Sequence, residues 1–376
     1  MTDKVIRLAF IGGGINSAVG MCHKIAAQMD GRFIIKSGCF SRHNEINLKT
    51  AEQWNIQKRH LYETPEDLLE NEKDNVDIIV VLTPTPSHFK LVTAAIKAGY
   101  DVICEKSLAT SSKEIDSINK VVKKHNAFLM VTYNYTGYPM LRELYTLIKQ
   151  EKLGKINQIQ IEMPQEGFAR LDKKGEPVKP QDWRLHDSKV TTISLDLGIH
   201  LVHMINFLSG KDPIEVVSTQ ASHGHFNEIT DNIMCIARYT DELLCQIWYS
   251  KTALGESNGL KVRVYGDKSS AEWYQMKPEH LTINNQFGEK QIMTRASCSA
   301  HESTIEHYNR FKAGHPAGFL EAFANHYYDL ADSYIEFLEK GSTSSPWVFS
   351  SEVARDGIAM LEAIATSSEK HQWQKI

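Results

Sequence analysis

The chain of 376 residues has neither an excess of positive charge nor a long apolar run. Its 42 lysines and arginines are outnumbered by 46 acidic residues, so nothing would neutralise a phosphate backbone and nucleic acid is not expected as a partner. No apolar run approaches the roughly 20 residues of a membrane helix, and the first residues lack the pattern of a signal peptide. We therefore expect a cytoplasmic protein that does not contact a membrane.

Cysteine is also scarce, and its spacing indicates reduced thiols. No two of the six cysteines form a C-x-x-C pair, and several lie inside apolar runs. The six positions are Cys22, Cys39, Cys104, Cys235, Cys245 and Cys298. Disulfide frameworks and cysteine-based metal sites need closer or more regular spacing, so neither is expected.

What is present indicates two domains, because a single core rarely grows beyond about 250–300 residues. In residues 1–133, short apolar segments alternate with helical patterns such as Ser17–Asp30. The expected strands are Val5–Ile11, Phe33–Phe40, Asp77–Thr83, Asp101–Cys104 and Ala127–Thr132. This alternation is typical of an α/β fold with a parallel sheet, so we predict a Rossmann dinucleotide-binding domain.

Residues 134–376 predict an α+β domain on a large, mostly antiparallel sheet, which would bind substrate and mediate oligomerisation. The expected strands are Ile156–Met163, Glu215–Gln220, Asn232–Tyr239, Leu243–Ser250, Leu260–Tyr265 and Ser270–Gln275, with closing helices near Phe319–Leu338 and Ser350–Glu369. A sheet covered on one side leaves an apolar face, for which Met234, Ile236, Ile247 and Tyr249 are candidates. We predict that this face is buried in a homodimer or homotetramer.

The first strand runs into Gly12-Gly13-Gly14-Ile15-Asn16-Ser17, which matches G-x-G-x-x-G except that Ser17 takes the place of the third glycine. Such glycines permit a tight turn and a close approach of backbone to a pyrophosphate at a helix N-terminus. Gly12, Gly14, Ile15 and Asn16 are therefore candidate cofactor-binding residues. The alternative is a glycine-rich connector without a ligand.

The end of the second strand bears on the choice of cofactor. An acidic residue there would bind the ribose hydroxyls of NAD, but this chain has Ser41 and Arg42. A hydroxyl and a guanidinium group suit the 2′-phosphate of NADP, so we favour NADP over NAD. Alternatively, Arg42 is an ordinary solvated residue or stacks on the adenine.

Two further loops follow predicted parallel strands, at the edge where such sheets bind ligands. Thr83, Pro84 and His88 follow the third strand, and Glu105 with Lys106 follows the fourth. We assign these residues to cofactor binding, with Lys106 also a catalytic candidate.

In the second domain, Asp196–Leu208 predicts an almost wholly apolar helix. At about 100° per residue, Asp196, His200 and His203 lie on one narrow stripe. Buried polar groups need a reason, and one reason is the wall of an active site. The alternatives are an internal hydrogen-bond network and a zinc site, although no second ligand cluster has matching spacing, so we predict no metal.

Together these features resemble the Gfo/Idh/MocA oxidoreductases over nearly the whole chain. The resemblance implies that Lys106 hydrogen-bonds the reacting hydroxyl, that His200 is the general acid/base, and that Asp196 is its acidic partner. Further candidate substrate contacts are Asn134, Tyr135, Trp183, Arg184 and His203. The chain departs from the family pattern at Ser107, where the family has proline, and in residues 189–194, which replace a glycine run.

We therefore predict an NAD(P)-dependent dehydrogenase or reductase acting on CH–OH groups. It would transfer a hydride between nicotinamide and a ring carbon of a sugar, nucleotide sugar or cyclitol. One alternative is a non-catalytic dinucleotide-binding regulator, which the catalytic set argues against. The other is an NAD-dependent glycosidase, which tightly retained cofactor without net turnover would mark.

Overall fold

The computed structural model describes residues 5–376, which form two compact units. The N-terminal unit comprises residues up to 137 together with 319–355, and the second unit comprises 138–318 and 356–376. The boundary predicted after residue 133 lies within a few residues of Gly137, where the chain first leaves the N-terminal unit. The prediction missed that the chain returns at 319–355 to the N-terminal unit.

The N-terminal unit has a six-stranded sheet in the order β14-β5-β4-β3-β1-β2, parallel except for β14. Its strands are β1 (Ile6–Gly12), β2 (Phe33–Cys39), β3 (Ile78–Leu82), β4 (Asp101–Glu105), β5 (Leu129–Thr132) and β14 (Phe349–Ser350). Its helices are α1 (Gly20–Met29), α2 (Asn44–Gln53), α3 (Pro65–Asn71), α4 (His88–Lys97), α5 (Ser112–His125) and α8 (Phe319–Lys340). The predicted Rossmann-type fold is confirmed.

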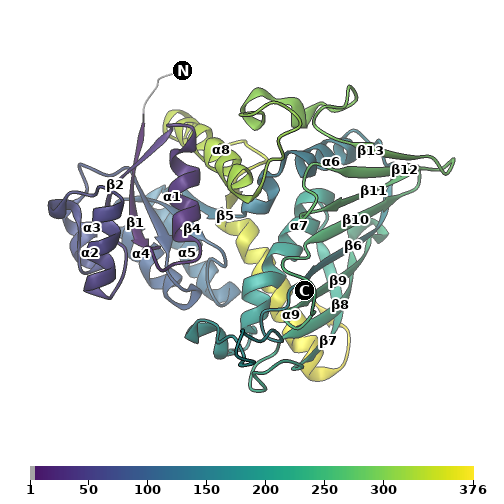
Figure 1. Ribbon diagram of the computed structural model, residues 1–376, viewed down its shortest axis with the longest axis horizontal. Coiled ribbons are helices and arrows are strands. Elements are labelled where there is room, and N and C mark those ends of the chain that lie inside the picture. The colour runs from purple at the N-terminus through teal and green to yellow at the C-terminus, as the bar shows by residue number, and fades with distance from the viewer. Residues whose placement is uncertain (1–4) are drawn as a thin grey trace. The chain divides into compact units, whose positions relative to one another are not determined.

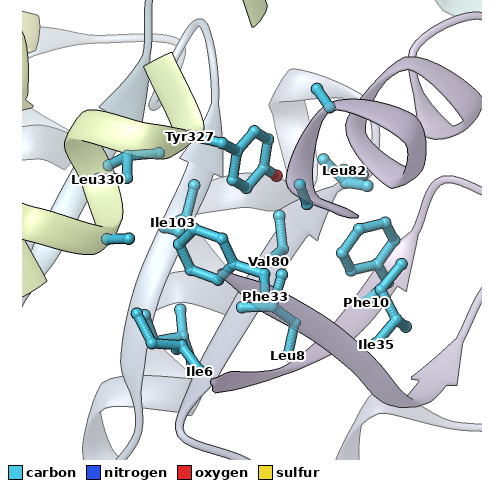
Figure 2. Packing of buried hydrophobic residues seen from close by; sticks show 14 of the residues in the cluster. Ile6, Leu8, Phe10, Phe33, Ile35, Val80, Leu82, Ile103, Tyr327 and Leu330 are labelled. Atoms are coloured by element: carbon cyan, nitrogen blue, oxygen red, sulfur yellow. The ribbon is translucent and has the colours of Figure 1, made fainter. Parts of the chain in front are cut away.

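Helix α8 belongs to this unit because its apolar side chains complete the core. Tyr327 and Leu330 lie in one buried cluster with Phe10, Phe33 and Val80 from the strands. Figure 2 shows these side chains meeting over the sheet, with α8 beside them. Burial of apolar surface is non-directional and independent of position in the chain, so Tyr327, which lies 247 positions after Val80, can supply one wall of the core.

The second unit has a nine-stranded, mostly antiparallel sheet in the order β13-β12-β11-β10-β6-β9-β8-β7-β15. Its strands are β6 (Ile156–Pro164), β7 (Pro213–Ala221), β8 (Asn232–Tyr239), β9 (Leu244–Ser250), β10 (Lys261–Gly266), β11 (Ser269–Tyr274), β12 (Leu281–Asn285), β13 (Lys290–Met293) and β15 (Gln374–Lys375). Its helices are α6 (Pro139–Lys149), α7 (Ile199–Ser209) and most of α9 (Ser351–Lys370). The predicted α+β sheet is confirmed.

Helices α6, α7 and α9 lie on one face of this sheet (Figure 1), and no helix of residues 5–376 covers the other. Met234 and Ile236 are about half exposed on the open face, as predicted. The expectation for Ile247 and Tyr249 was wrong: both are fully buried on the helix-covered face. Strand alternation separates two faces, but it does not say which one the helices cover.

Candidate functional site

The glycine turn joins β1 to α1 with backbone in contact on both sides. Gly12 and Gly13 have φ of +82° and +74°, a region that favours glycine. A Cβ on Gly20 would lie 1.8 Å from the carbonyl oxygen of Gly13. Gly20, not the position of Ser17, therefore permits the close packing of helix on strand. The helix also begins at Gly20, later than predicted, because residues 15–19 form turns and Ser17 Oγ accepts a hydrogen bond from Gly20 N–H.

Two backbone amides of the turn are used to fix its shape. Gly14 N–H donates to the carbonyl oxygen of Phe40 (3.1 Å), and Ile15 N–H donates to Thr50 Oγ1 (3.1 Å). Asn16, the next residue, is exposed at the tip of the turn. The turn is thus pre-shaped by the protein itself, which lowers the entropy lost when a ligand binds.

The segment after β2 carries no carboxylate near its start. Phe40 is buried, Ser41 is partly buried and Arg42 is exposed. Ser41 Oγ accepts a hydrogen bond from His43 N–H (3.1 Å), which forms a local turn. Arg42 makes no ion pair or hydrogen bond with the described part of the chain, so its guanidinium group is available to an anion.

His88 links the loop after β3 to the loop after β4. Its Nε2 lies 2.6 Å from the carbonyl oxygen of Thr83, and its Nδ1 lies 2.7 Å from that of Ser107. The ring is fully buried, so His88 positions the two loops and does not offer a nitrogen to a ligand. Burial lowers the pKa of His88, although the two carbonyl acceptors oppose this shift.

Glu105 ends β4, and Lys106 follows it. Glu105 is buried and its Oε1 lies 3.0 Å from His23 Nε2, whereas Lys106 is partly exposed. The peptide bond between Lys106 and Ser107 is cis. Both predicted residues therefore lie at the carboxyl edge of the parallel sheet, the edge that binds ligands in such folds.

The next strand along this edge ends in buried polar groups without partners. Thr132 Oγ1 and Asn134 Nδ2 have no hydrogen-bond partner among residues 5–376, and both residues are at least 95% buried. Tyr135 is also buried, with its ring beside that of Phe319. Unsatisfied buried polar atoms are costly, and a bound ligand relieves that cost. These atoms and the glycine turn fit a dinucleotide cofactor. Such a cofactor would supply hydride transfer, which amino-acid side chains do not perform.

The second unit holds the other predicted residues on and beside α7. A π-helical turn, Ser194–Gly198, precedes the helix and carries Asp196. His200 and His203 follow in α7, and all three side chains are buried. A Cβ on Gly198 would lie 2.8 Å from Cζ of Tyr249, so only glycine lets the helix pack against that ring. Turns of this kind are frequent at functional sites.

Asp196 is paired with two cations. Its Oδ2 lies 2.9 Å from Lys251 Nζ and 3.2 Å from Arg184 Nε. Arg184 also stacks on the ring of Trp183, 4.5 Å from its centre. Lys251 was not among the site residues predicted from the sequence, in which its one local signal is that it directly follows the apolar strand β9.

The structure therefore groups the predicted residues in two sets, one in each unit. No group of three or more histidine, cysteine or acidic side chains in residues 5–376 has the geometry of a metal site. The described helices also include none long and apolar enough to cross a membrane. What the two sets offer is chemistry for small polar ligands: a glycine turn that lets a pyrophosphate approach the backbone, cations for developing negative charge, and imidazoles for protons.

Comparisons with known proteins agree with this geometry. Residues 6–133 match the family model described as "Oxidoreductase family, NAD-binding Rossmann fold", and residues 141–272 match the "GFO/IDH/MocA C-terminal domain". The chain is 28% identical to an uncharacterized oxidoreductase of Bacillus subtilis, covering 88% of this chain and 85% of that protein. It is 24% identical to inositol 2-dehydrogenase of Rhizobium meliloti, covering 79% and 80%.

A solved structure of similar fold is the inositol dehydrogenase homologue of Azotobacter vinelandii in complex with NAD⁺. It superposes with a TM-score of 0.90 at 25% identity, covering 99% of this chain and 98% of that one. The same protein with NADH and myo-inositol gives a TM-score of 0.88, also at 25% identity and over 99% and 98% of the two chains. The chain therefore belongs to the GFO/IDH/MocA family and is an oxidoreductase with an NAD-binding Rossmann domain.

Proposed function

We propose that this enzyme transfers a hydride between a nicotinamide cofactor and a hydroxyl-bearing ring carbon of a sugar, nucleotide sugar or cyclitol. The observation that carries the proposal is the buried set formed by Asp196 in the π-helical turn and by His200 and His203 on the mostly apolar helix α7 that follows it. Relatives named inositol 2-dehydrogenase and levoglucosan dehydrogenase support the substrate class.

In the proposed reaction, the bound nicotinamide supplies or accepts the hydride. The imidazole of His200 takes the hydroxyl proton during oxidation and returns it during reduction. The ammonium group of Lys106 donates a hydrogen bond to the same oxygen and stabilises its developing negative charge. Asp196, held by Lys251 and Arg184, is the acidic partner of His200 and orients the groups that meet the substrate.

Further substrate contacts are proposed from polar and aromatic groups around these residues. Trp183 and Arg184 form a stacked pair beside Asp196, and an aromatic face with a guanidinium group suits a ring with several hydroxyls. His203 lies one turn beyond His200 on the same helix. In the N-terminal unit, Asn134 and Tyr135 are the corresponding candidates.

We also propose that the enzyme prefers NADP to NAD. Support comes from the exposed Arg42 and from the lack of an acidic side chain directly after β2. The glycine turn and the loops at Thr83, Pro84 and Glu105 would hold the rest of the cofactor.

The proposed assembly is a homodimer or homotetramer formed through the open face of the nine-stranded sheet. Exposed apolar side chains there, Met234, Ile236 and Leu244, support an interface. A cytoplasmic location is proposed as well, and it is supported by six cysteines that are all free thiols, four of them buried.

The experiment that tests the function is a dehydrogenase screen. Purified protein is mixed with NAD or NADP and a panel of free sugars, cyclitols and nucleotide sugars, and reduced cofactor is followed by absorbance. We expect turnover with at least one ring polyol. Cofactor binding without turnover on any of them would contradict the proposal, and hydrolysis of glycosides with retained cofactor would identify a glycosidase instead.

A further inference from the structure

A chain of three polar side chains lies buried inside the N-terminal unit. It links Tyr327 on α8, His23 on α1 and Glu105 at the end of β4. The distance from Tyr327 Oη to His23 Nδ1 is 2.7 Å, and that from His23 Nε2 to Glu105 Oε1 is 3.0 Å. His23 is fully buried, and Figure 2 shows Tyr327 with its oxygen atom directed toward the purple helix α1.

The partners determine which atoms donate. A carboxylate only accepts, so Nε2 of His23 carries the proton and donates to Glu105. Nδ1 then accepts from the hydroxyl of Tyr327, and burial together with the nearby Glu105 raises the pKa of that phenol well above its usual range, so the proton stays on the oxygen. The ring of Phe323 packs edge to face against the imidazole of His23, with 4.6 Å between the two ring centres, and this contact favours the observed orientation of the imidazole.

We propose that His23 and Tyr327 are positioning residues that hold the Glu105 carboxylate at the nicotinamide end of the cofactor site. The proposal rests on the proposed function. Doubly wound sheets place the adenosine half of a dinucleotide toward β2, so the nicotinamide half extends toward β3 and β4. Glu105 ends β4 directly before Lys106, and His23 lies in the first turn of the helix that follows the glycine turn. The same buried chain therefore ties the pyrophosphate turn to the lysine loop.

Tyr327→Phe tests the proposal, with Tyr334→Phe as its matched control. Both phenols are buried on α8, and the hydroxyl of Tyr334 hydrogen-bonds Asp101, at the start of β4 rather than its end. Binding of NADH, NADPH and ADP is measured by fluorescence and calorimetry, because ADP lacks the nicotinamide ribose. We expect Tyr327→Phe to weaken binding of the reduced cofactors about 3- to 10-fold and to leave ADP binding unchanged. Both variants should lower the melting temperature by a similar amount, but Tyr334→Phe should leave the affinities for the reduced cofactors and for ADP unchanged.

A second pair of variants tests His23. Glutamine places an amide nitrogen at the position of Nε2, whereas asparagine reaches only the position of Nδ1. His23→Gln should therefore keep the cofactor affinity that His23→Asn loses. Equal cofactor affinity in the two tyrosine variants, or equal loss of ADP and NADH binding in Tyr327→Phe, would overturn the positioning role alone. An unmutated protein that binds neither NADH nor NADPH would instead overturn the proposed function, and this inference with it.

Discussion

Asp196 shows how a buried carboxylate is accommodated beside the proposed general base. An unpaired charge in this position would be costly, but the ammonium group of Lys251 and the guanidinium group of Arg184 both lie within 3.2 Å. With Asp196 engaged by two cations, the side chains of the following helix α7 suited to exchanging a proton near neutral pH are the imidazoles of His200 and His203, of which His200 is the proposed base.

Replacing His200 with alanine separates a catalytic role from a structural one. If His200 is the general base, kcat should fall by about 10²–10⁴-fold, because that is the usual contribution of a positioned base. Cofactor affinity should hardly change, since the dinucleotide binds the N-terminal unit. Turnover and melting temperature are measured on the same preparation, with the exposed His225→Ala as control. A lower melting temperature with nearly normal turnover per folded molecule would assign His200 to a structural network.

Arg42 is the residue on which the cofactor preference depends. Arg42→Ala should weaken NADP binding by about tenfold, because a charge-assisted hydrogen bond to a phosphate is lost, and should leave NAD binding nearly unchanged. Arg59→Ala, which removes another exposed arginine of the same unit, is the control. Titration of each variant with both cofactors gives the result. Equal losses, or tighter NAD binding by the unmutated protein, would reverse the proposed preference.

At the scale of elements, one imidazole joins two loops. His88 begins α4, yet its two ring nitrogens lie within hydrogen-bond distance of carbonyl oxygens in different loops, that of Thr83 before the helix and that of Ser107 after β4. A neutral imidazole has one N–H, so it donates to one of these two oxygens at a time. Because both loops carry proposed cofactor contacts, the position of each depends on the protonation and packing of a side chain that itself is fully buried.

His88 should make stability depend on pH. Its pKa is lowered in the folded state, so below its unfolded pKa, about 6.5, the unfolded chain takes up a proton that the folded chain resists. The stabilisation is therefore fully present above about pH 6.5 and declines as pH falls below that value. Urea unfolding at pH 7.5 and 5.5 measures how much free energy of unfolding each protein loses between the two pH values. This loss should be smaller for His88→Gln than for the unmutated protein, and the two losses should differ by at most about 1.4 kcal/mol per pH unit. The exposed His43→Gln is the control, and identical pH dependence in all three proteins would refute this role.

At the scale of the whole molecule, no helix within residues 5–376 covers the open face of the nine-stranded sheet. Its exposed side chains alternate along β8 and β9, which makes the face continuous across the middle of the sheet. Contiguous apolar surface of this kind is typical of protein interfaces.

Charged substitutions on this face test the proposed assembly. Met234→Lys with Ile236→Lys should convert the oligomer to monomers, because burying two unpaired ammonium groups in an interface is unfavourable. Phe287→Lys, at an exposed turn away from this patch, should leave the assembly intact. Light scattering at micromolar concentration measures the mass of each protein. A monomeric unmutated protein would contradict the proposal.

Local pattern in the sequence was enough to predict the Rossmann sheet, the antiparallel domain, the glycine turn and the polar stripe on α7. Each depends on residues within a few positions of one another, through the alternation of strands, the 3.6-residue period of helices and the backbone freedom of glycine. The family resemblance rests on the same motifs, and the two matching family models confirm it.

Only the tertiary structure decided features that depend on residues far apart in the chain. The return of α8 to the N-terminal core and the pairing of Lys251 with Asp196 both depend on packing between separate elements. The face of the sheet on which Tyr249 is buried was likewise decided by how the helices pack on that sheet. Packing and ion pairing act through distance in space, which a sequence pattern does not encode, so these contacts appear only when the chain is folded.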